Sequence, residues 1–280
     1  MAKLPPFPGT TGRRDWRTAF NAIRILLNDG DDTTQVFRIM RALNVGNAPV
    51  NYARMIATAE GGRMAYERVE LAKRFSDPAY VAQFAPGTVG AAYRDFLATT
   101  GYSADGLVEV SKVISEDELP HPYAWFGRRI RDTHDIWHVL NGYKADESLG
   151  EAALVAFSYA QVGGLGWAFI GGAAALKSIG VTGNLLFAKA VWEGYVRGRR
   201  AKWLAGEDYE MLMHEPLEAA RARLGLTTPV AYLKAQRELG AELASYLSQR
   251  RDDAVAGEAA VGAAIAPAET PTRVEEPLAA

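Results

Sequence analysis

The stretch of sequence that decides the fold reads Arg131-Asp-Thr-His-Asp-Ile-Trp-His-Val-Leu-Asn-Gly-Tyr-Lys-Ala-Asp-Glu-Ser-Leu-Gly-Glu151. It contains His134 and His138, and residues four apart lie on one face of an α-helix about one turn from each other. Asp135 lies between them, on the adjoining side of the same helix. The spacing therefore predicts two imidazoles and a carboxylate that can be directed at one point.

A second helix is expected to return the chain to this point. Gly142 can end the first helix, since glycine adopts the left-handed cap conformation, and a polar loop follows. Glu151 then opens the next apolar segment, where a carboxylate is favoured near a helix N-terminus. A helix, a reversal and a second helix would bring Glu151 back to the two histidines. We therefore predict two nitrogen ligands and two carboxylate ligands for a divalent metal.

The main alternative is that these histidines are ordinary core residues, which is the commoner role of a single histidine on an apolar helix face. Two histidines at this spacing, with Asp135 beside them and Glu151 after the turn, favour the metal site. The helical His-Glu-x-x-His motif of zinc proteases has the same spacing, but the shorter Asp135 is placed as a ligand rather than as a general base. Imidazole and carboxylate ligands suit zinc, iron or manganese, and ligand type alone does not select among them.

The motif resembles the signature of the coenzyme Q (ubiquinone) biosynthesis protein family, which carries His-Asp-x-x-His, eleven residues and then Glu. Here twelve residues separate His138 from Glu151, and we interpret the extra one as an insertion in the turn at Lys144–Ser148. Residues 86–97 resemble the proline-glycine-led helix of the same family. Residues 192–225 resemble its C-terminal block, so the resemblance extends over about 86–226.

The resemblance implies zinc as the metal, and it implies that the metal ligands and catalytic residues are His134, Asp135, His138 and Glu151. It also implies the reaction, an oxidative decarboxylation of a polyprenylated 4-hydroxybenzoate-derived ring that replaces the carboxylate with hydroxyl on the route to ubiquinone. A divalent ion suits this chemistry because it can bind the phenolate and carboxylate oxygens. The alternative is a non-catalytic lipid-binding scaffold that gathers ubiquinone biosynthetic enzymes at the membrane and holds a structural metal. A structural zinc site is closed, whereas a catalytic one keeps a position open.

Helical periodicity dominates the rest of the chain. We predict an all-α fold: a single multi-helix domain over residues 13–250, with a central metal-binding helix pair and an apolar lipid pocket. Within it we expect one helix over Arg63–Phe75 and a central helix that begins near Tyr123 or Phe126 and includes both histidines. Three prolines make residues 1–12 extended, and residues 251–280, rich in Ala, Glu and Pro, are expected to be a disordered tail.

Residues Ala152–Leu176 carry no charge over 25 positions, which is long enough for a membrane span. Small residues recur at every fourth position, a pattern that lets another helix approach closely. Polar residues and glycines lower the hydropathy, so we favour one buried helix that lines a lipid-sized pocket over a membrane span. The small residues are Ala152, Ala156, Ala160, Gly164, Ala168 and Gly172.

The charged residues leave two interpretations open. Arg128, Arg129 and Arg131 could bind an anionic head group near the metal or simply cover the surface. A basic and aromatic patch after residue 191 suits an anionic membrane surface, but a solvated helix face has comparable weight. Its members are Arg197, Arg199, Arg200 and Lys202, with Trp192, Tyr195 and Trp203.

Three smaller assignments concern single side chains. His121, between two prolines, and His214 are expected to be structural or surface residues. Asp132 is a candidate for orienting a ligand imidazole by a hydrogen bond from outside the metal's ligand set.

Composition bounds the cellular setting. The net charge of −2 gives no case for nucleic acid binding, and the absence of cysteine excludes disulfides, iron–sulfur ligation and thiolate metal sites. The N-terminus lacks the apolar core of a secretion signal. We therefore expect a cytoplasmic protein, peripherally associated with the inner (cytoplasmic) membrane. Its expected partners are the polyprenylated aromatic precursor, other ubiquinone biosynthetic proteins and a second copy of the chain in a homodimer.

Overall fold

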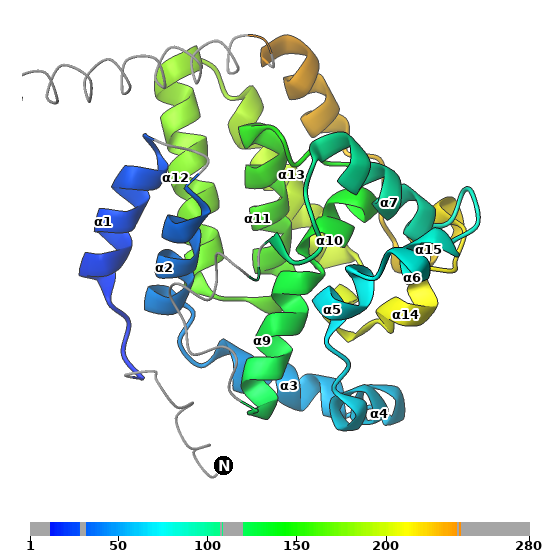
Figure 1. The fold of residues 1–280 in the computed structure, drawn as a ribbon. Helices are drawn as coiled ribbons and strands as arrows, with labels where there is room; N and C mark the ends of the chain where they lie inside the picture. Colours follow the sequence, from blue (N-terminus) through cyan, green and yellow to red (C-terminus); the bar gives the residue numbers. More distant parts are fainter. Residues whose placement is uncertain (1–11, 29–31, 107, 109–119, 240, 242–280) are drawn as a thin grey trace, which may run out of the picture.

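The computed structural model describes residues 12–28, 32–106, 108, 120–239 and 241 (Figure 1). Within these ranges the chain forms helices and no strand, apart from an isolated bridge between Thr88 and Pro216, which confirms the all-α prediction. Nearly all of the predicted extended segment 1–12 and the whole predicted tail 251–280 lie outside the described residues.

The helices pack around α11, which lies near the middle of the view in Figure 1. Its most extensive contacts are with α13 and then α12, while α1 and α2 pack on each other and on the outer side of α12. Residues 230–239 form a further helix. The bounds are α1 Trp16–Leu26, α2 Thr33–Leu43, α3 Asn47–Ile56, α4 Ala59–Glu67, α5 Leu71–Phe75, α6 Pro78–Ala82, α7 Val89–Thr100, α9 Pro122–Asp132, α10 His134–Asn141, α11 Ser148–Val162, α12 Leu165–Thr182, α13 Leu186–Arg200, η1 Leu204–Gly206, α14 Tyr209–Leu212 and α15 Leu217–Leu224.

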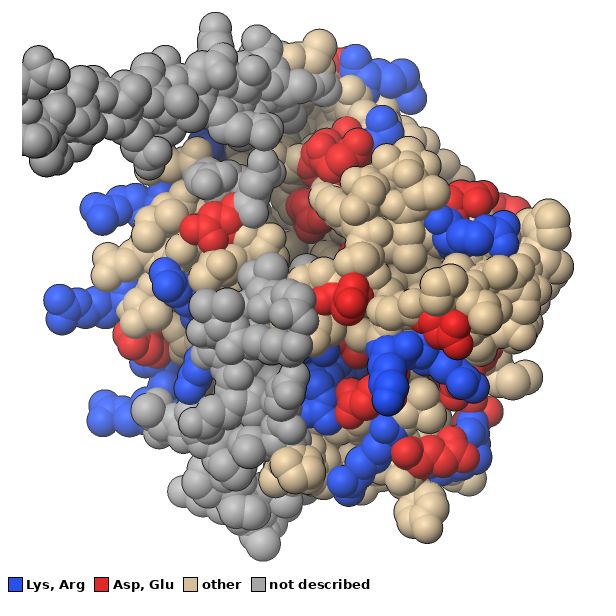
Figure 2. Space-filling view, viewed as in Figure 1, with Lys and Arg blue, Asp and Glu red and all other residues tan. Residues whose placement is uncertain are grey.

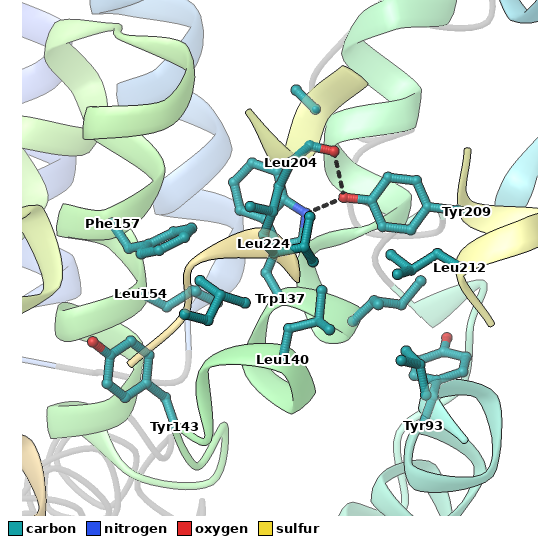
Figure 3. Close-up of a cluster of buried hydrophobic side chains, with 14 of the residues drawn as sticks. Tyr93, Trp137, Leu140, Tyr143, Leu154, Phe157, Leu204, Tyr209, Leu212 and Leu224 are labelled. Carbon is teal, nitrogen blue, oxygen red and sulfur yellow. Dashed lines mark hydrogen bonds between the residues drawn. The ribbon is translucent and has the colours of Figure 1, made fainter. Parts of the chain in front are cut away.

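The larger hydrophobic core surrounds α10 and α11, the helices that carry the predicted ligands. Trp137 and Phe157 pack edge to face within it, with ring centroids 6.0 Å apart. The Trp137 indole N–H donates to the Tyr209 hydroxyl, which donates in turn to the carbonyl of Leu204, so the buried polar atoms are paired (Figure 3). This core fixes α10 and α11 rigidly relative to each other.

Helices α11 and α13 approach closely because glycines face the partner backbone. A Cβ atom added at Gly194 would lie 2.3 Å from the carbonyl oxygen of Ala153, and one at Gly198 would lie 2.6 Å from that of Phe157. No side chain can occupy such a position without moving one of the helices. The glycines therefore set the spacing of the two helices.

Two predicted helices are each divided in the structure. The prediction of one helix over Arg63–Phe75 is wrong: α4 ends at Glu67, the capping residue Arg68 has a left-handed φ of 49°, and α5 begins at Leu71. The prediction of a single central helix is also wrong, since α9 ends at Asp132 and α10 begins at His134.

The uncharged stretch Ala152–Leu176 is likewise two helices rather than one. Gly163 and Gly164 both have positive φ values, 69° and 94°, which end α11 and turn the chain into α12. Among the described residues, α12 is the one helix that is long and apolar enough to cross a membrane. Its 18 residues have a mean hydropathy of 1.3, and 22% of the helix is buried inside the protein.

Charged side chains of both signs lie side by side on the lower right of the face in Figure 2. Two ion pairs involve the short helices: Arg63 pairs with Asp208, and Arg74 pairs with Glu210 at 2.9 Å. Both pairs join α4 or α5 to the segment that carries α14. They are partly exposed, so each contributes little to stability and serves mainly to fix the register of these segments.

Candidate metal centre

The break between α9 and α10 determines where the histidines point. The Thr133 hydroxyl donates to the carbonyl of Arg129 at 2.9 Å, and a new helix starts at His134. His134 and His138 therefore lie on the first two turns of α10. Gly142 ends this helix with a φ of 71°, as the sequence predicts, and its N–H donates to the carbonyl of His138.

The reversal after α10 brings Glu151, in the first turn of α11, to both imidazoles. Nε2 of His138 lies 3.1 Å from one carboxylate oxygen of Glu151, and Nε2 of His134 lies 3.5 Å from the other. One ligand atom from each of the three residues lies within 4.8 Å of the other two. Tetrahedral zinc with bonds of about 2.0–2.2 Å places neighbouring ligand atoms about 3.4 Å apart. The two distances from Glu151 to the imidazoles, 3.1 and 3.5 Å, are close to this spacing.

His138 carries the clearest sign of a missing partner. Its side chain is completely buried, and its Nε2 makes no hydrogen bond of normal geometry within the described part of the chain. A buried polar atom without a partner costs free energy, so its presence calls for an explanation. A metal ion between His138 and Glu151 would supply one, and the residues present fit it.

The charges of the three groups are strongly coupled. Burial alone would lower the pKa of His134, but the hydrogen bond and charge of Glu151 outweigh it and leave that pKa above its ordinary value. Burial would raise the pKa of Glu151, but His138 and His134 together lower it well below its usual range. Glu151 is therefore ionised at neutral pH and available as a ligand.

Asp135, the fourth predicted ligand, is not in the group of three. Its side chain is buried beside them, and burial raises its pKa even though His134 and His138 act in the opposite direction. The structure thus brings together His134, His138 and Glu151, while ligation by Asp135 stays a prediction.

Three residues that the sequence did not single out support the imidazoles. Nδ1 of His138 lies 3.2 Å from the backbone carbonyl oxygen of Tyr143. Phe96 stacks on His138 with centroids 6.1 Å apart, and Trp167 stacks on His134 at 6.3 Å and 11°. Only the proximity of Tyr143 to the motif could have suggested one of them, because Phe96 and Trp167 are far away in sequence.

Asp132 does not orient a ligand imidazole. Its carboxylate accepts from the backbone N–H of Ala72 at 3.1 Å and pairs with Arg131 at 2.8 Å. The reason is the helix break at Thr133, which separates Asp132 from the helix that carries both histidines.

The other predicted cations have mainly structural roles. Arg128 pairs with Glu70, and the buried Arg129 donates to the carbonyl of Glu207. Arg197, placed in a surface patch by the sequence, is instead buried, whereas Arg199 and Arg200 are exposed. The patch therefore does not form one continuous surface.

The remaining aromatic and histidine assignments are settled by packing. Trp203 donates to the carbonyl of Gln161 and stacks on Phe126, so it belongs to the packed interior rather than to a surface patch. His121 caps α9 through Nδ1, which accepts from the N–H of Tyr123, and His214 is exposed. Both histidines have the structural or surface roles expected of them.

An apolar groove of about 470 Å³ lies between α11, α12 and α13. Trp167 lines this groove and stacks on His134, so the groove begins beside the candidate metal centre. Small residues from the predicted stripe form its floor, because their side chains leave the space open. They are Ala156, Ala168 and Gly172.

Comparison with known proteins identifies the family. The family model described as coenzyme Q (ubiquinone) biosynthesis protein Coq4 matches residues 49–230. The chain belongs to this family. Its match covers most of the chain and includes every residue of the candidate metal centre, which confirms the resemblance seen in the sequence.

Curated relatives agree with this assignment. The mitochondrial ubiquinone biosynthesis protein COQ4 homologues of Rattus norvegicus and Homo sapiens are each 26% identical to the chain, over 178 and 176 residues. Each match covers 62% of this chain and 64% of the relative, so the chain spans somewhat less than two thirds of these proteins. These relatives therefore agree with membership of the Coq4 family.

A crystal structure of a protein assigned to ubiquinone biosynthesis in Nostoc punctiforme shares the fold. The TM-score is 0.55 at 19% sequence identity, and the superposition covers 77% of this chain and 100% of that one. At this identity the likeness supports the all-α architecture alone.

Proposed function

We propose that the protein catalyses a metal-dependent oxidative decarboxylation in ubiquinone biosynthesis, in which a polyprenylated 4-hydroxybenzoate-derived ring loses its carboxylate and gains a hydroxyl. The exchange breaks the bond between the ring and the carboxylate, releases carbon dioxide and forms a carbon–oxygen bond with oxygen from water. The two electrons and two protons that this releases pass to an external two-electron acceptor. The observation that carries the proposal is the meeting of His134, His138 and Glu151 beside Trp167, which stacks on His134 and also lines an apolar groove. Such a groove suits the polyprenyl chain, and the ligands suit the oxygens of the ring.

In this proposal His134, His138 and Glu151 hold a zinc ion, with iron or manganese as the alternatives, and Asp135 completes the catalytic set. The ion would supply Lewis-acid stabilisation of charge on the substrate oxygens. The protein's own residues do the positioning: Trp167 stacks on His134 and lines the groove, and the apolar groove walls contact the polyprenyl chain of the substrate. The side chain of Glu151 is 41% exposed, so the site is reachable from outside.

Complementation of a ubiquinone-deficient strain tests the proposal. Expression of His134→Ala or Glu151→Ala should fail to restore ubiquinone, and the still-carboxylated polyprenyl ring should accumulate. His214→Ala is the matched control, because His214 is exposed and is not part of the group of three, and it should restore ubiquinone fully. Full restoration of ubiquinone by both ligand variants would show that the metal plays no part in the reaction.

The second candidate is a lipid-binding scaffold that gathers ubiquinone biosynthetic proteins at the membrane. It is favoured by the apolar residues that α12 leaves outside the core, such as Leu176, whose exposed fraction is 73%. In a scaffold the metal is structural, so Glu151→Ala would reduce folding or partner binding and would cause loss of several pathway steps together. Accumulation of one carboxylated ring, with the partner proteins still bound, distinguishes the enzyme from the scaffold.

The proposed setting is the cytoplasmic face of the inner membrane, with peripheral attachment and a homodimeric state. Support comes from the same exposed apolar residues, together with Trp192, which is 65% exposed at the groove rim. Fractionation tests the attachment: extraction into the soluble phase by carbonate supports a peripheral protein, and retention in the membrane would favour a span through α12. Analytical ultracentrifugation measures the oligomeric state, and a monomer at cellular concentration would contradict the dimer.

A further inference from the structure

The backbone around Tyr143 holds His138 from two sides. The N–H of Tyr143 donates to the carbonyl of His138 at 3.2 Å, and the carbonyl oxygen of Tyr143 lies 3.2 Å from Nδ1 of the His138 ring. A carbonyl can only accept, so this contact requires the proton on Nδ1. Nε2, which has no hydrogen bond of normal geometry among the described residues, can then offer its lone pair to an ion held between it and the Glu151 carboxylate 3.1 Å away.

Arg197 on α13 holds Tyr143 in place. Its Nη1 donates to the Tyr143 hydroxyl at 2.6 Å, and its guanidinium carbon lies 5.0 Å from the centre of the Tyr143 ring. Its Nη2 donates to the carbonyls of Asn141 and Thr227. The Arg197 fork thus ties the end of α10 to the residue that contacts the His138 ring.

The burial of Arg197 indicates a specific use. The residue is 6% exposed, and the acceptors that it contacts are a hydroxyl and two carbonyls, all uncharged. Burying a cation against neutral acceptors costs more than burying an apolar side chain of similar volume. Arginine offers the planar fork that can reach all three acceptors, whereas lysine carries a single ammonium group.

Tyr232 holds the same loop from the opposite side. Its ring packs edge to face on Tyr143 with centroids 4.9 Å apart, and its hydroxyl accepts from the N–H of Lys144 at 3.0 Å. Glu193 on α13 accepts from the N–H groups of residues 231 and 232 and so fixes the start of the helix that carries Tyr232. Tyr143 is therefore gripped between α13 and the helix at 230–239.

We propose that Arg197 is a positioning residue for the metal centre: through Tyr143 it fixes the tautomer and the direction of the His138 imidazole. The inference rests on the proposed metal centre, because its functional value is a His138 Nε2 that is free to ligate. The contact between the Tyr143 carbonyl and Nδ1 of His138 exists without metal, so it can be observed independently.

The first test reads the His138 ring in metal-free protein labelled with ¹⁵N in histidine. Long-range ¹H–¹⁵N spectra report the tautomer once the ring is neutral, which a pH titration establishes, and His138→Gln assigns the signals. Wild type should show the proton on Nδ1, whereas Arg197→Lys and Tyr143→Phe should show a mixture of tautomers. A wild-type proton on Nε2, or an Nδ1 proton unchanged in both variants, would overturn the proposal.

The second test measures cobalt(II), whose visible spectrum reports ligand geometry. Loss of a partner that orients a ligand typically weakens metal binding by about 10–100-fold, so both variants should lose about tenfold or more and should show an altered spectrum. The double variant should be no worse than the more severe single variant, because both changes break the same link. Additive losses with unaltered spectra would indicate a general structural role and would contradict the proposal.

Matched controls separate positioning from stability. Arg129→Lys alters another buried arginine that donates to a backbone carbonyl, and Tyr209→Phe removes another buried hydroxyl. Both should lower the unfolding temperature while leaving the His138 tautomer and the cobalt spectrum as in wild type. If Arg197→Lys does not fold, the ring and cobalt spectra of Tyr143→Phe decide between the two roles. Failure of wild type to bind cobalt would contradict the metal centre, while the ring spectra would still decide the tautomer.

Discussion

Helices α11 and α12 come from one uncharged stretch of sequence and have similar composition, but their surroundings differ. In α11, Leu154 and Phe157 are completely buried, and the helix packs on α10, α12 and α13. In α12 the buried residues are few, and Leu176 is 73% exposed. The buried residues of α12 are Gly166, Ile170, Gly171 and Ser178.

Hydropathy therefore specifies how much apolar surface a helix carries but not what covers it. Helix α11 is covered by protein, and its first turn supplies Glu151 to the candidate metal centre. Helix α12 meets α2 on one side and an open groove on the other. Helix α11 is therefore a core helix, whereas α12 has an exposed apolar face that lipid or another protein can cover.

The largest expected effect is a difference in stability between alanine substitutions of two leucines, one on each helix. Leu154→Ala should lower the free energy of unfolding by about 2–5 kcal/mol, because it leaves a cavity in the core. Leu176→Ala should change it by less than about 0.5 kcal/mol, since the side chain is mostly exposed. Urea denaturation of both variants in detergent-free buffer measures the difference. Equal losses would show that α12 is as enclosed as α11.

A second pair compares glycines. Gly194→Ala should lower the free energy of unfolding by about 1–3 kcal/mol, because the added Cβ would lie 2.3 Å from the carbonyl oxygen of Ala153 on α11. Gly180→Ala on α12 meets no atom within 4 Å and should raise it by up to about 1 kcal/mol through helix propensity. The same denaturation experiment applies, and a tolerated Gly194→Ala would mean that α11 and α13 can separate.

Glu151, at the start of α11, should make the free energy of unfolding depend on pH. The pKa of His134 is raised by Glu151, so in metal-free protein this pair stabilises fully below the unfolded value of 6.5, and the contribution is lost as pH rises through the folded pKa. The free energy of unfolding should therefore fall over that range in wild type. Metal affinity should rise over the same range, because only a neutral imidazole binds the ion.

Glu151→Gln tests the source of that pH dependence. It removes the carboxylate that raises the pKa of His134, so the fall in stability with rising pH should flatten. Denaturation midpoints from about pH 6 to 9 bracket the ordinary histidine pKa. A slope unchanged in Glu151→Gln would place the titrating group elsewhere.

Periodicity and motif spacing predicted much of this architecture. The four-residue spacing of His134 and His138, with Gly142 as the helix end, correctly predicted that Glu151 returns to the imidazoles. These features are local, because a helix face and a glycine cap depend on few neighbours. The twelve-residue separation did not displace Glu151, because the extra residue lies in the loop.

The errors arose where tertiary packing overrides local pattern. The glycines at 163 and 164 divide an apolar run that hydropathy treats as continuous, and Thr133 divides the central helix. Arg197 looked like a surface cation because its neighbours Arg199 and Arg200 are exposed. Its burial depends on Tyr143 and Thr227, which the fold brings from distant positions.

The smallest effect on stability, and the sharpest comparison of the two helices, concerns lipid. Leu176→Ser should leave the free energy of unfolding within about 0.5 kcal/mol of wild type, since the side chain has few neighbours to lose. It should nevertheless weaken binding to anionic lipid vesicles if the exposed side of α12 meets the membrane. Complete burial of a leucine side chain is worth about 1.5–3 kcal/mol, so the loss should be about tenfold or somewhat more.

Val50→Ser on α3 is the matched control, because Val50 is 68% exposed and α3 contributes no residue to the lining of the groove. Vesicle flotation of the two variants beside wild type should show a loss for Leu176→Ser alone. Equal losses of vesicle binding would mean that any exposed apolar side chain contributes, whatever its position. No loss of binding in either variant would mean that the exposed face of α12 binds a protein partner rather than lipid. Because neither substitution disturbs the core, any difference between them must come from what the outer side of α12 contacts, which is the property that distinguishes it from α11.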